Sequence, residues 1–332
     1  MTARNEHWLR TDGSGLYCAP GGFHIDPQRA VERAVITHGH GDHARPNNRK
    51  VLATAATLDI MRLRLGEAAG ETLQPLAYGE TLRIGEVDVC LVPAGHVLGS
   101  AQVVLEYAGS RIVVSGDYKR RRDPTCAGFE LVTCDIFITE ATFALPVFRH
   151  PPDGEEIDKL LGSLKLFPDR AHLVGVYGLG KCQRVIALLR EAGYDRPIYL
   201  HGALQTLCEF YEGQGVALGP LCYATARDGK EMAGEIVLAP PSALKEVWSR
   251  RMPNPRTAMA SGWMRVRQRL VELPLIISDH ADWDELTQTL TEVEAGEIWV
   301  THGREEALVH WAAQRGLKAR ALSLAGFEDE AE

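Results

Sequence analysis

The segment 37–44, THGHGDHA, constrains this chain most, because it places four side chains that bind metals within six residues. His38 and His40 are two positions apart after an apolar run, so in extended backbone both imidazoles project to the same side. Asp42 and His43 follow in a turn, where the intervening glycines relieve backbone strain and permit a close approach. The alternative to a metal site is a polar turn that contains histidines by chance. Four such side chains within six residues favour a metal site, with one ion at His38 and His40 and another at Asp42 and His43.

Three further candidate ligands, His96, Asp117 and His302, each follow or end a later strand-like run. Side chains at the carboxyl ends of strands meet at one rim of a sheet, although each residue alone could be a hydrogen-bonded turn residue. All candidates together supply five imidazoles and two carboxylates, which suit two divalent ions of the zinc type rather than calcium or magnesium. Two such ions about 3.5–4 Å apart can share a hydroxide and stabilise both sides of an in-line displacement at phosphorus, which points to hydrolysis.

The chain has 332 residues, which suits one large α/β domain or a host domain with an insertion. Mostly continuous apolar runs, typical of strands covered on both faces, occur at 34–37, 87–92, 101–107, 111–116 and 135–140. From about residue 154 helical and strand-like segments alternate, at 155–167, 171–177, 181–193 and 197–202. That alternation predicts βα crossovers and a parallel sheet, so we expect one domain interrupted by another.

Composition bears on where the protein is located and on how it could bind nucleic acid. Hydrophobic residues make up 45% and charged residues 24% of the chain, and no apolar run approaches the roughly 20 residues of a membrane span. The first 15 residues lack the apolar core of a secretory signal, and the seven cysteines form no CxxC pair, so we expect a cytoplasmic protein with reduced thiols. The net charge of -8 argues against nonspecific coating of nucleic acid, so any polyanion site must be a local patch.

The pattern HxHxDH, followed by single His, Asp and His ligands, resembles the metallo-β-lactamase superfamily. The segments 139-TEATF-143, 278-SDHAD-282 and 301-THG-303 are similar to the three signature motifs of the β-CASP nucleases. Five further segments resemble the bacterial ligase-associated DNA exonucleases; these are 15-GLYCAPGGFHIDP-27, 94-AGHVLGSAQV-103, 115-SGDYKRRRD-123, 240-PPSA-243 and 260-ASGWM-264. The resemblance extends from about Leu16 to Leu322.

The resemblance implies an α/β fold, a metallo-β-lactamase αββα sandwich with an inserted α/β β-CASP domain of parallel sheet and flanking helices. The implied boundaries are 1–145 and 273–325 for the two parts of the lactamase domain, 146–272 for the insert, and 326–332 for an acidic tail.

The resemblance also implies a ligand set for two divalent metal ions. His38, His40 and His96 would hold the first ion, Asp42, His43 and His302 the second, and Asp117 would bridge them. Zinc is the expected metal, while Mn²⁺ or Fe²⁺ could use the same donors. Asp26 would orient a ligand from behind, or cap a helix over 27–34, or do both.

Asp42, Glu140 and His280 are the implied catalytic residues. A leaving oxygen needs a proton, and histidine is the side chain most readily poised to give one near neutral pH. A carboxylate on its other ring nitrogen fixes the tautomer and favours the imidazolium, so we assign His280 as general acid and Glu140 as its orienting partner. A purely structural role is the alternative for both.

Three places offer groups for an anionic substrate. The basic run 119-KRRR-122 follows Asp117, so Lys119, Arg120 and Arg121 could contact substrate instead of forming an ordinary solvated charge run. Gly180 and Lys181 open an expected helix, where free N–H groups favour anions, and Ser261 and Gly262 could cradle a terminal phosphate. Trp263 and Arg265 offer base stacking and phosphate contacts.

These features together predict a metal-dependent nuclease, a DNA exonuclease working 5′ to 3′ in DNA repair by attack of a metal-bridging hydroxide. The expected partners are DNA and, by association of the group, an ATP-dependent DNA ligase and a helicase, with no membrane. The alternative is an RNA-processing β-CASP endo- or exoribonuclease. His302 favours that alternative, because histidine at the third signature motif is the type seen in RNA-acting members.

Overall fold

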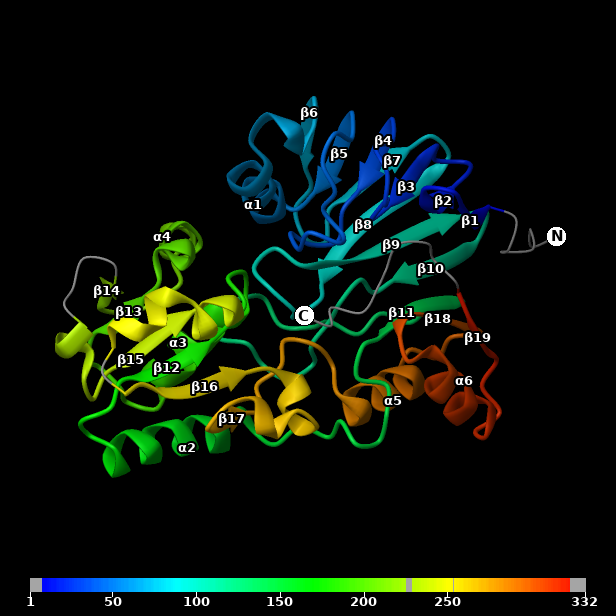
Figure 1. Ribbon diagram of the computed structural model, residues 1–332. Coiled ribbons are helices and arrows are strands. Elements are labelled where there is room, and N and C mark those ends of the chain that lie inside the picture. Colours follow the sequence, from blue (N-terminus) through cyan, green and yellow to red (C-terminus); the bar gives the residue numbers. More distant parts are fainter. Residues whose placement is uncertain (1–7, 225–228, 253, 323–332) are drawn as a thin grey trace. The chain divides into compact units, whose positions relative to one another are not determined.

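The computed structural model describes residues 8–224, 229–252 and 254–322. The chain divides into two compact units (Figure 1). Unit 1 comprises Met1–Pro146 and His280–Glu332, and unit 2 comprises Val147–Asp279. The domain boundaries expected from the sequence were 145/146 and 272/273, and the expected acidic tail 326–332 lies outside the described residues.

The first sheet of unit 1 has the strand order β1-β2-β3-β4-β5-β6. Its strands are β1 (Leu9–Asp12), β2 (Gly15–Cys18), β3 (Phe23–Ile25), β4 (Arg33–Val35), β5 (Lys50–Ala53) and β6 (Thr72–Pro75). The pairs β1-β2 and β2-β3 are antiparallel, whereas β3 to β6 run parallel. Helix α1 (Ala55–Leu65) supplies the crossover between β5 and β6.

The second sheet of unit 1 has the order β19-β18-β11-β10-β9-β8-β7. Its strands are β7 (Thr81–Ile84), β8 (Val87–Pro93), β9 (Ala101–Tyr107), β10 (Ser110–Val114), β11 (Ile136–Ala141), β18 (Glu297–Gly303) and β19 (Ala319–Ala321). Strands β7 to β10 form an antiparallel meander, and β10, β11, β18 and β19 are parallel. Helices α5 (Trp283–Glu292) and α6 (Glu305–Ala313) flank β18 in sequence.

Unit 1 is layered as helix, sheet, sheet and helix. Its central core joins side chains of both sheets, such as Phe23 and Leu52 with Leu91, Ile138 and Trp299. The outer face of the first sheet packs against α1, and the outer face of the second sheet packs against α5 and α6. Each sheet is therefore apolar on both faces, which explains why the strand-like runs are continuous rather than alternating.

Unit 2 is built on a parallel sheet with the order β14-β13-β15-β12-β16-β17. The strands are β12 (His172–Gly175), β13 (Ile198–Leu200), β14 (Leu221–Tyr223), β15 (Ile236–Ala239), β16 (Arg256–Ala260) and β17 (Leu273–Leu275). The helices are α2 (Asp153–Leu166), α3 (Lys181–Glu191) and α4 (Gln205–Gly213), with short 3₁₀ turns between later strands. The α/β class and the parallel sheet expected from the alternating segments are confirmed.

Candidate metal centre

The candidate ligands gather at strand ends within unit 1. His38 and His40 follow β4, His96 follows β8, Asp117 follows β10, and His302 lies near the end of β18. Strands β8, β10 and β18 run in the same direction, because β8 and β10 are both antiparallel to β9 and β10 is parallel to β11 and β18 in turn. Their carboxyl ends therefore share one rim of the second sheet, as in other α/β sites.

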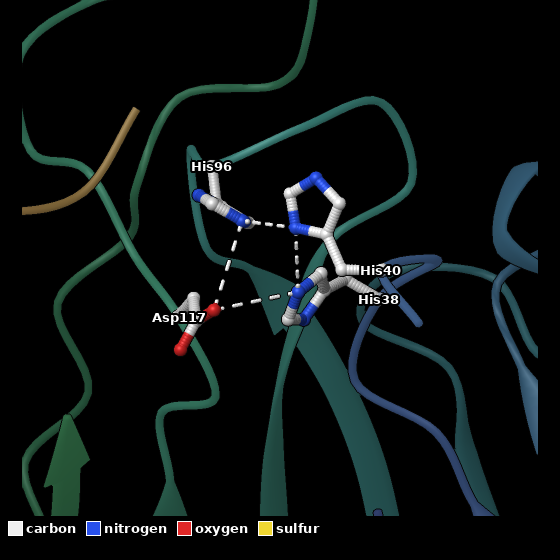
Figure 2. Close-up of side chains that lie close together, drawn as sticks. All are labelled: His38, His40, His96 and Asp117. Atoms are coloured by element: carbon white, nitrogen blue, oxygen red, sulfur yellow. Dashed lines mark hydrogen bonds and ion pairs between the residues drawn. The ribbon is translucent and has the colours of Figure 1, made fainter. Parts of the chain in front are cut away.

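Figure 2 shows the first donor group, in which three imidazoles and one carboxylate face one another. The Nδ1 atom of His40 lies 3.1 Å from His38 Nε2 and 3.0 Å from His96 Nε2. The Oδ2 atom of Asp117 lies 3.5 Å from His38 Nε2 and 3.8 Å from His96 Nε2. Donors bound to one tetrahedral zinc lie about 3.4 Å apart when the Zn–N bonds are about 2.0–2.1 Å, so these four atoms fit one ion.

A second donor group consists of Asp42, His43 and His302. Asp42 Oδ2 lies 3.5 Å from His43 Nε2 and 3.6 Å from His302 Nε2. The same Asp117 Oδ2 atom that faces the first group lies 3.4 Å from His43 Nε2. Asp117 is thus the side chain that could be shared by two ions.

The other oxygen of Asp117 provides a test of whether these residues fit a metal. Oδ1 is buried and has no hydrogen-bond partner among the described residues, while His302 Nδ1 lies 3.8 Å away. A buried carboxylate oxygen without a donor is costly, and a cation removes that cost. The donor set, with imidazole nitrogens and carboxylate oxygens in both groups, fits divalent ions of the zinc type.

The ionisation of the group follows from its burial and mutual charge. Burial, with the neighbouring His43 imidazole, holds the pKa of His38 well below its usual value. His38 is therefore neutral, and the neutral imidazole is the form that binds metal. Burial would likewise lower the pKa of His43, but the carboxylates of Asp117 and Asp42 outweigh it and raise that pKa well above the usual value. Burial would raise the pKa of Asp117, but the surrounding imidazoles hold it well below its usual value. The carboxylates therefore hold positive charge at this place.

Asp26 supports the second donor group from behind. Its Oδ2 atom accepts from Thr37 Oγ1 at 2.6 Å and lies 2.7 Å from His43 Nδ1, and its Oδ1 atom accepts from the Thr37 N–H at 2.8 Å. Nδ1 of His43 is thereby engaged, and Nε2 is left facing Asp42 and Asp117. The alternative helix over 27–34 is not formed; Asp26 has φ 44°, and β4 begins at Arg33.

His302 adopts a backbone conformation that non-glycine residues rarely use. Its φ is 62°, and the next residue, Gly303, has φ 122°. A Cβ atom at Gly303 would lie 2.4 Å from the carbonyl oxygen of Ala141, so β18 can approach β11 here only through a glycine. Left-handed backbone at a non-glycine residue costs about 1–3 kcal/mol and concentrates at functional sites.

His280 and Glu140 form a second contact beside the donor groups. Nδ1 of His280 lies 3.0 Å from Glu140 Oε2 and 4.0 Å from Asp117 Oδ2. Glu140 Oε1 accepts from the N–H of Tyr118 at 2.8 Å, which fixes the carboxylate. A carboxylate at Nδ1 places the proton there and leaves Nε2 as the atom that exchanges a proton.

The prediction that the basic run contacts substrate is wrong for Lys119. Its side chain is 1% exposed, and Nζ donates to Glu285 at 2.8 Å and to the carbonyl oxygen of His280 at 3.1 Å. Arg120 pairs with Glu292 at 2.5 Å, and Arg121 pairs with Asp282. The run binds the first turn and the acidic side of α5, because Asp282 caps that helix and Glu285 receives the N–H groups of Arg120 and Arg121.

The predicted anion site at Gly180 and Lys181 is also corrected. Gly180 precedes α3 as expected, with φ 83°, but its N–H donates to Gln183 Oε1 at 2.9 Å. Lys181 is buried, and its Nζ lies 2.5 Å from Asp279 Oδ1. The N–H of Gly180 and the ammonium of Lys181 are therefore engaged inside unit 2.

The predicted substrate-binding residues around Trp263 differ in their exposure to solvent. Ser261 and Gly262 are buried, and Ser261 Oγ accepts from the N–H of Trp263 at 3.3 Å. Trp263 is half-buried and packs edge-to-face on Phe148 at 5.2 Å between ring centres. Arg265 is exposed, with Nε donating to the carbonyl oxygen of Val147 at 3.2 Å. Their roles toward substrate stay predictions.

Two residues near the donor groups were not predicted from the sequence. Thr37 holds Asp26, as described above, and its position directly before His38 was a usable signal. Arg64 donates to the carbonyl oxygen of Gly39 from the last turn of α1, and nothing in the sequence links those positions.

Fold and donor groups together define an α/β protein with a candidate dinuclear metal centre. No protein-family model matches the chain. A solved protein of unknown function from Enterococcus faecalis shares the fold, with a TM-score of 0.59 at 14% sequence identity, over 89% of this chain and 80% of that chain. No helix among the described residues combines the length and apolarity needed to cross a membrane.

Curated relatives add names at low sequence identity. The chain is 29% identical over 316 residues to a probable DNA ligase from Opitutus terrae, covering 93% of this chain and 30% of the relative. It is 30% identical over 212 residues to a ribonuclease from Thermus thermophilus, covering 55% and 48%. It is 29% identical over 221 residues to an endoribonuclease from Neurospora crassa, covering 54% and 26%. The chain thus spans less than half the length of each of these relatives, and the names fit the resemblance to metallo-β-lactamase and β-CASP nucleases.

Proposed function

We propose that this chain is a metal-dependent phosphodiesterase of the metallo-β-lactamase and β-CASP type, and specifically a DNA exonuclease of the ligase-associated group. The observation that carries the proposal is the pair of donor groups that meet at Asp117, with His280 and Glu140 beside them. The relative named as a probable DNA ligase supports DNA as substrate, because its similarity extends over 93% of this chain. Degradation runs from the 5′ end during DNA repair, in association with a ligase and a helicase.

His38, His40 and His96 would hold one divalent ion, Asp42, His43 and His302 the other, and Asp117 both. When bound, two such ions supply a nucleophile from water at neutral pH and stabilise charge on the attacking and leaving oxygens. Zinc suits these donors, and manganese or iron could use them as well.

The protein residues would contribute orientation and a proton. Asp26 fixes the ring of His43 through Nδ1, which holds Nε2 toward the second donor group. Glu140 holds His280 through Nδ1, so the imidazolium of His280 can deliver a proton from Nε2 to the leaving oxygen. Asp42 would help to hold the second ion, since it faces both His43 and His302.

Digestion of end-labelled nucleic acids tests the proposal. Single- and double-stranded DNA and matched RNA are incubated with the wild-type chain, His40→Ala, Asp42→Ala and His310→Ala. The last is a matched control, because His310 is an exposed histidine of α6 that contacts Gln314 outside the donor groups. We expect stepwise release of mononucleotides from the 5′ end of DNA, lost in the first two variants and kept in the third. Equal or faster cleavage of RNA would contradict the DNA assignment.

The acid role of His280 has its own test. His280→Ala should lower the cleavage rate about 10²- to 10⁴-fold while two metal ions per chain are retained. Full activity in that variant would remove the acid role, and loss of metal would make His280 a ligand instead.

An RNA-processing nuclease is the second candidate function. Relatives named as endoribonucleases or as a ribonuclease favour it, and so does His302, whose imidazole faces Asp42 at 3.6 Å. The digestion above separates the two candidates, because it compares the cleavage rates of DNA and matched RNA by the same chain.

A further inference from the structure

Positive charge is scarce in unit 1, where a polyanion would have to reach the donor groups. Unit 1 carries 19 Lys and Arg against 29 Asp and Glu, whereas unit 2 carries 17 against 15. The cations next in sequence to Asp117 are bound to the acidic side of α5. A phosphate beside the metal centre would therefore find no cation among these three side chains.

Arg64 meets that need by its position. It lies in the last turn of α1, and its Nη1 donates to the carbonyl oxygen of Gly39, which stands between His38 and His40. The donor loop, residues 38–43, is therefore in direct contact with this guanidinium, although Gly39 and Arg64 are 25 positions apart.

Gly41 makes room for the same guanidinium. A Cβ atom at position 41 would lie 2.8 Å from Nη2 of Arg64, closer than a real Cβ atom can come. The backbone of Gly41 does not have a positive φ, so an alanine at position 41 would not strain the backbone but would displace the Arg64 guanidinium from its present place. The guanidinium thus contacts the carbonyl oxygen of residue 39 and occupies space that the missing side chain of Gly41 leaves open.

The guanidinium retains capacity for a ligand. Arginine has five N–H donors, and the contact to Gly39 uses one nitrogen. Arg64 is exposed over part of its surface, and among the described residues it forms no ion pair, whereas Arg62 on the same helix pairs with Asp59 at 2.8 Å. Partial burial lowers the pKa of Arg64 and the Asp42 carboxylate opposes that shift, so the side chain stays a cation beside the donor loop.

We propose that Arg64 binds a phosphate of the nucleic-acid strand next to the scissile one, holding the strand at the donor loop. This inference rests on the proposed nuclease function. A planar guanidinium fixed by a carbonyl group presents its remaining N–H groups to phosphate oxygens in a fork geometry. Arg64 is then a substrate-binding residue, and its effect appears in affinity rather than in the chemical step.

The test measures binding without metal, so that cleavage does not intervene. A short fluorescent single-stranded oligodeoxynucleotide is titrated in EDTA across a series of KCl concentrations with wild type, Arg64→Gln, Arg64→Lys and Arg62→Gln. Arg64→Gln should weaken binding roughly tenfold at low salt and reduce the slope of log K against log salt by about 0.7. Arg64→Lys should keep the slope and lose part of the affinity, and Arg62→Gln should match wild type.

A second readout separates substrate binding from support of the loop. With metal restored, Arg64→Gln should keep the metal content of wild type and raise KM with kcat within about twofold, as expected for lost uniform binding. Loss of metal with an unchanged salt slope would make Arg64 a support of the loop and overturn the inference. Equal salt slopes for Arg64→Gln and Arg62→Gln would also overturn it, even if the wild type cleaves DNA. A wild-type chain that neither binds nor cleaves nucleic acid would overturn the inference and the proposed function together.

Discussion

Two basic runs look alike in the sequence and behave oppositely in the structure. In the first run, 119–122, the cations from Lys119 to Arg121 turn inward and pair with carboxylates of α5 or its cap. In the second run, 265–269, every residue is exposed, and the described contacts of Arg265 and Arg267 are to a carbonyl oxygen and to the ring of Trp263. The charge of a run therefore says nothing about its role until the location of complementary carboxylates is known.

The inward run should carry the largest effect on stability. Replacing Lys119 by alanine leaves the buried Glu285 carboxylate without its nearest cation, and Arg121 Nε at 3.9 Å replaces that contact only in part. The free energy of unfolding should fall by about 3 kcal/mol. Arg269→Ala in the outward run should stay within about 0.5 kcal/mol of wild type. Urea unfolding followed by tryptophan fluorescence measures both free energies of unfolding. Equal losses in the two variants would contradict the difference between the inward and the outward run.

The same buried pair predicts acid sensitivity. Burial would raise the pKa of Glu285, but Lys119 and backbone N–H groups lower it from 4.5 to about 2. A carboxyl with a lowered folded-state pKa stabilises the protein fully above its unfolded-state pKa, and this stabilisation is lost as the pH falls through the folded-state pKa. We expect a loss of roughly 3 kcal/mol between about pH 5 and pH 2, measured by urea unfolding at each pH. Glu285→Gln should be less stable at neutral pH and show a flatter profile; an unchanged profile would refute the assignment.

The outward run should matter for affinity and hardly for stability. Replacing Arg265, Arg267 and Arg269 by glutamine should reduce the slope of log K against log salt for single-stranded DNA by up to about 2, if each contacts one phosphate. The free energy of unfolding should change by less than about 1 kcal/mol. Fluorescence anisotropy in a salt series gives the slope. A triple variant that binds like wild type would show that exposed charge here is only solvated.

Arg121 should have an effect on stability between those of Lys119 and Arg269, because it is only partly exposed. Its side chain is 33% exposed and pairs with the fully buried Asp282. Arg121→Gln leaves a buried carboxylate without this cation, so it should cost about 1–3 kcal/mol of unfolding free energy. The salt slope of DNA binding should stay unchanged. A smaller slope of log K against log salt without loss of stability would instead show that Arg121 contacts the substrate, as the sequence analysis predicted.

Local sequence patterns predicted much of the fold and the gathering of the candidate metal ligands. Residues close in sequence or at strand ends could be predicted to lie together, because strand direction and glycine spacing fix where such side chains point. Nε2 of His38 indeed lies 3.1 Å from Nδ1 of His40. The α/β class and the parallel sheet of unit 2 followed from alternation of segments in the same way.

Contacts across long sequence separations could not be predicted. Lys119 and Glu285 are 166 positions apart, so a basic run and an acidic helix gave no sign that they pair. The same holds for Arg64 and Gly39, which meet only because α1 returns past the donor loop. At Asp26 a local rule failed, since the expected helix after it is replaced by an irregular segment that leads to β4.

The number of divalent ions bound per chain tests the central claim most directly. Purified protein is saturated with zinc, dialysed and analysed for metal by mass spectrometry, alongside His302→Ala and the control His310→Ala. The two donor groups predict two ions in wild type and in the control, and about one in His302→Ala, which removes a ligand from the second group alone. A wild-type chain that binds no zinc, or one that loses nothing in His302→Ala, would contradict the assignment of a dinuclear centre.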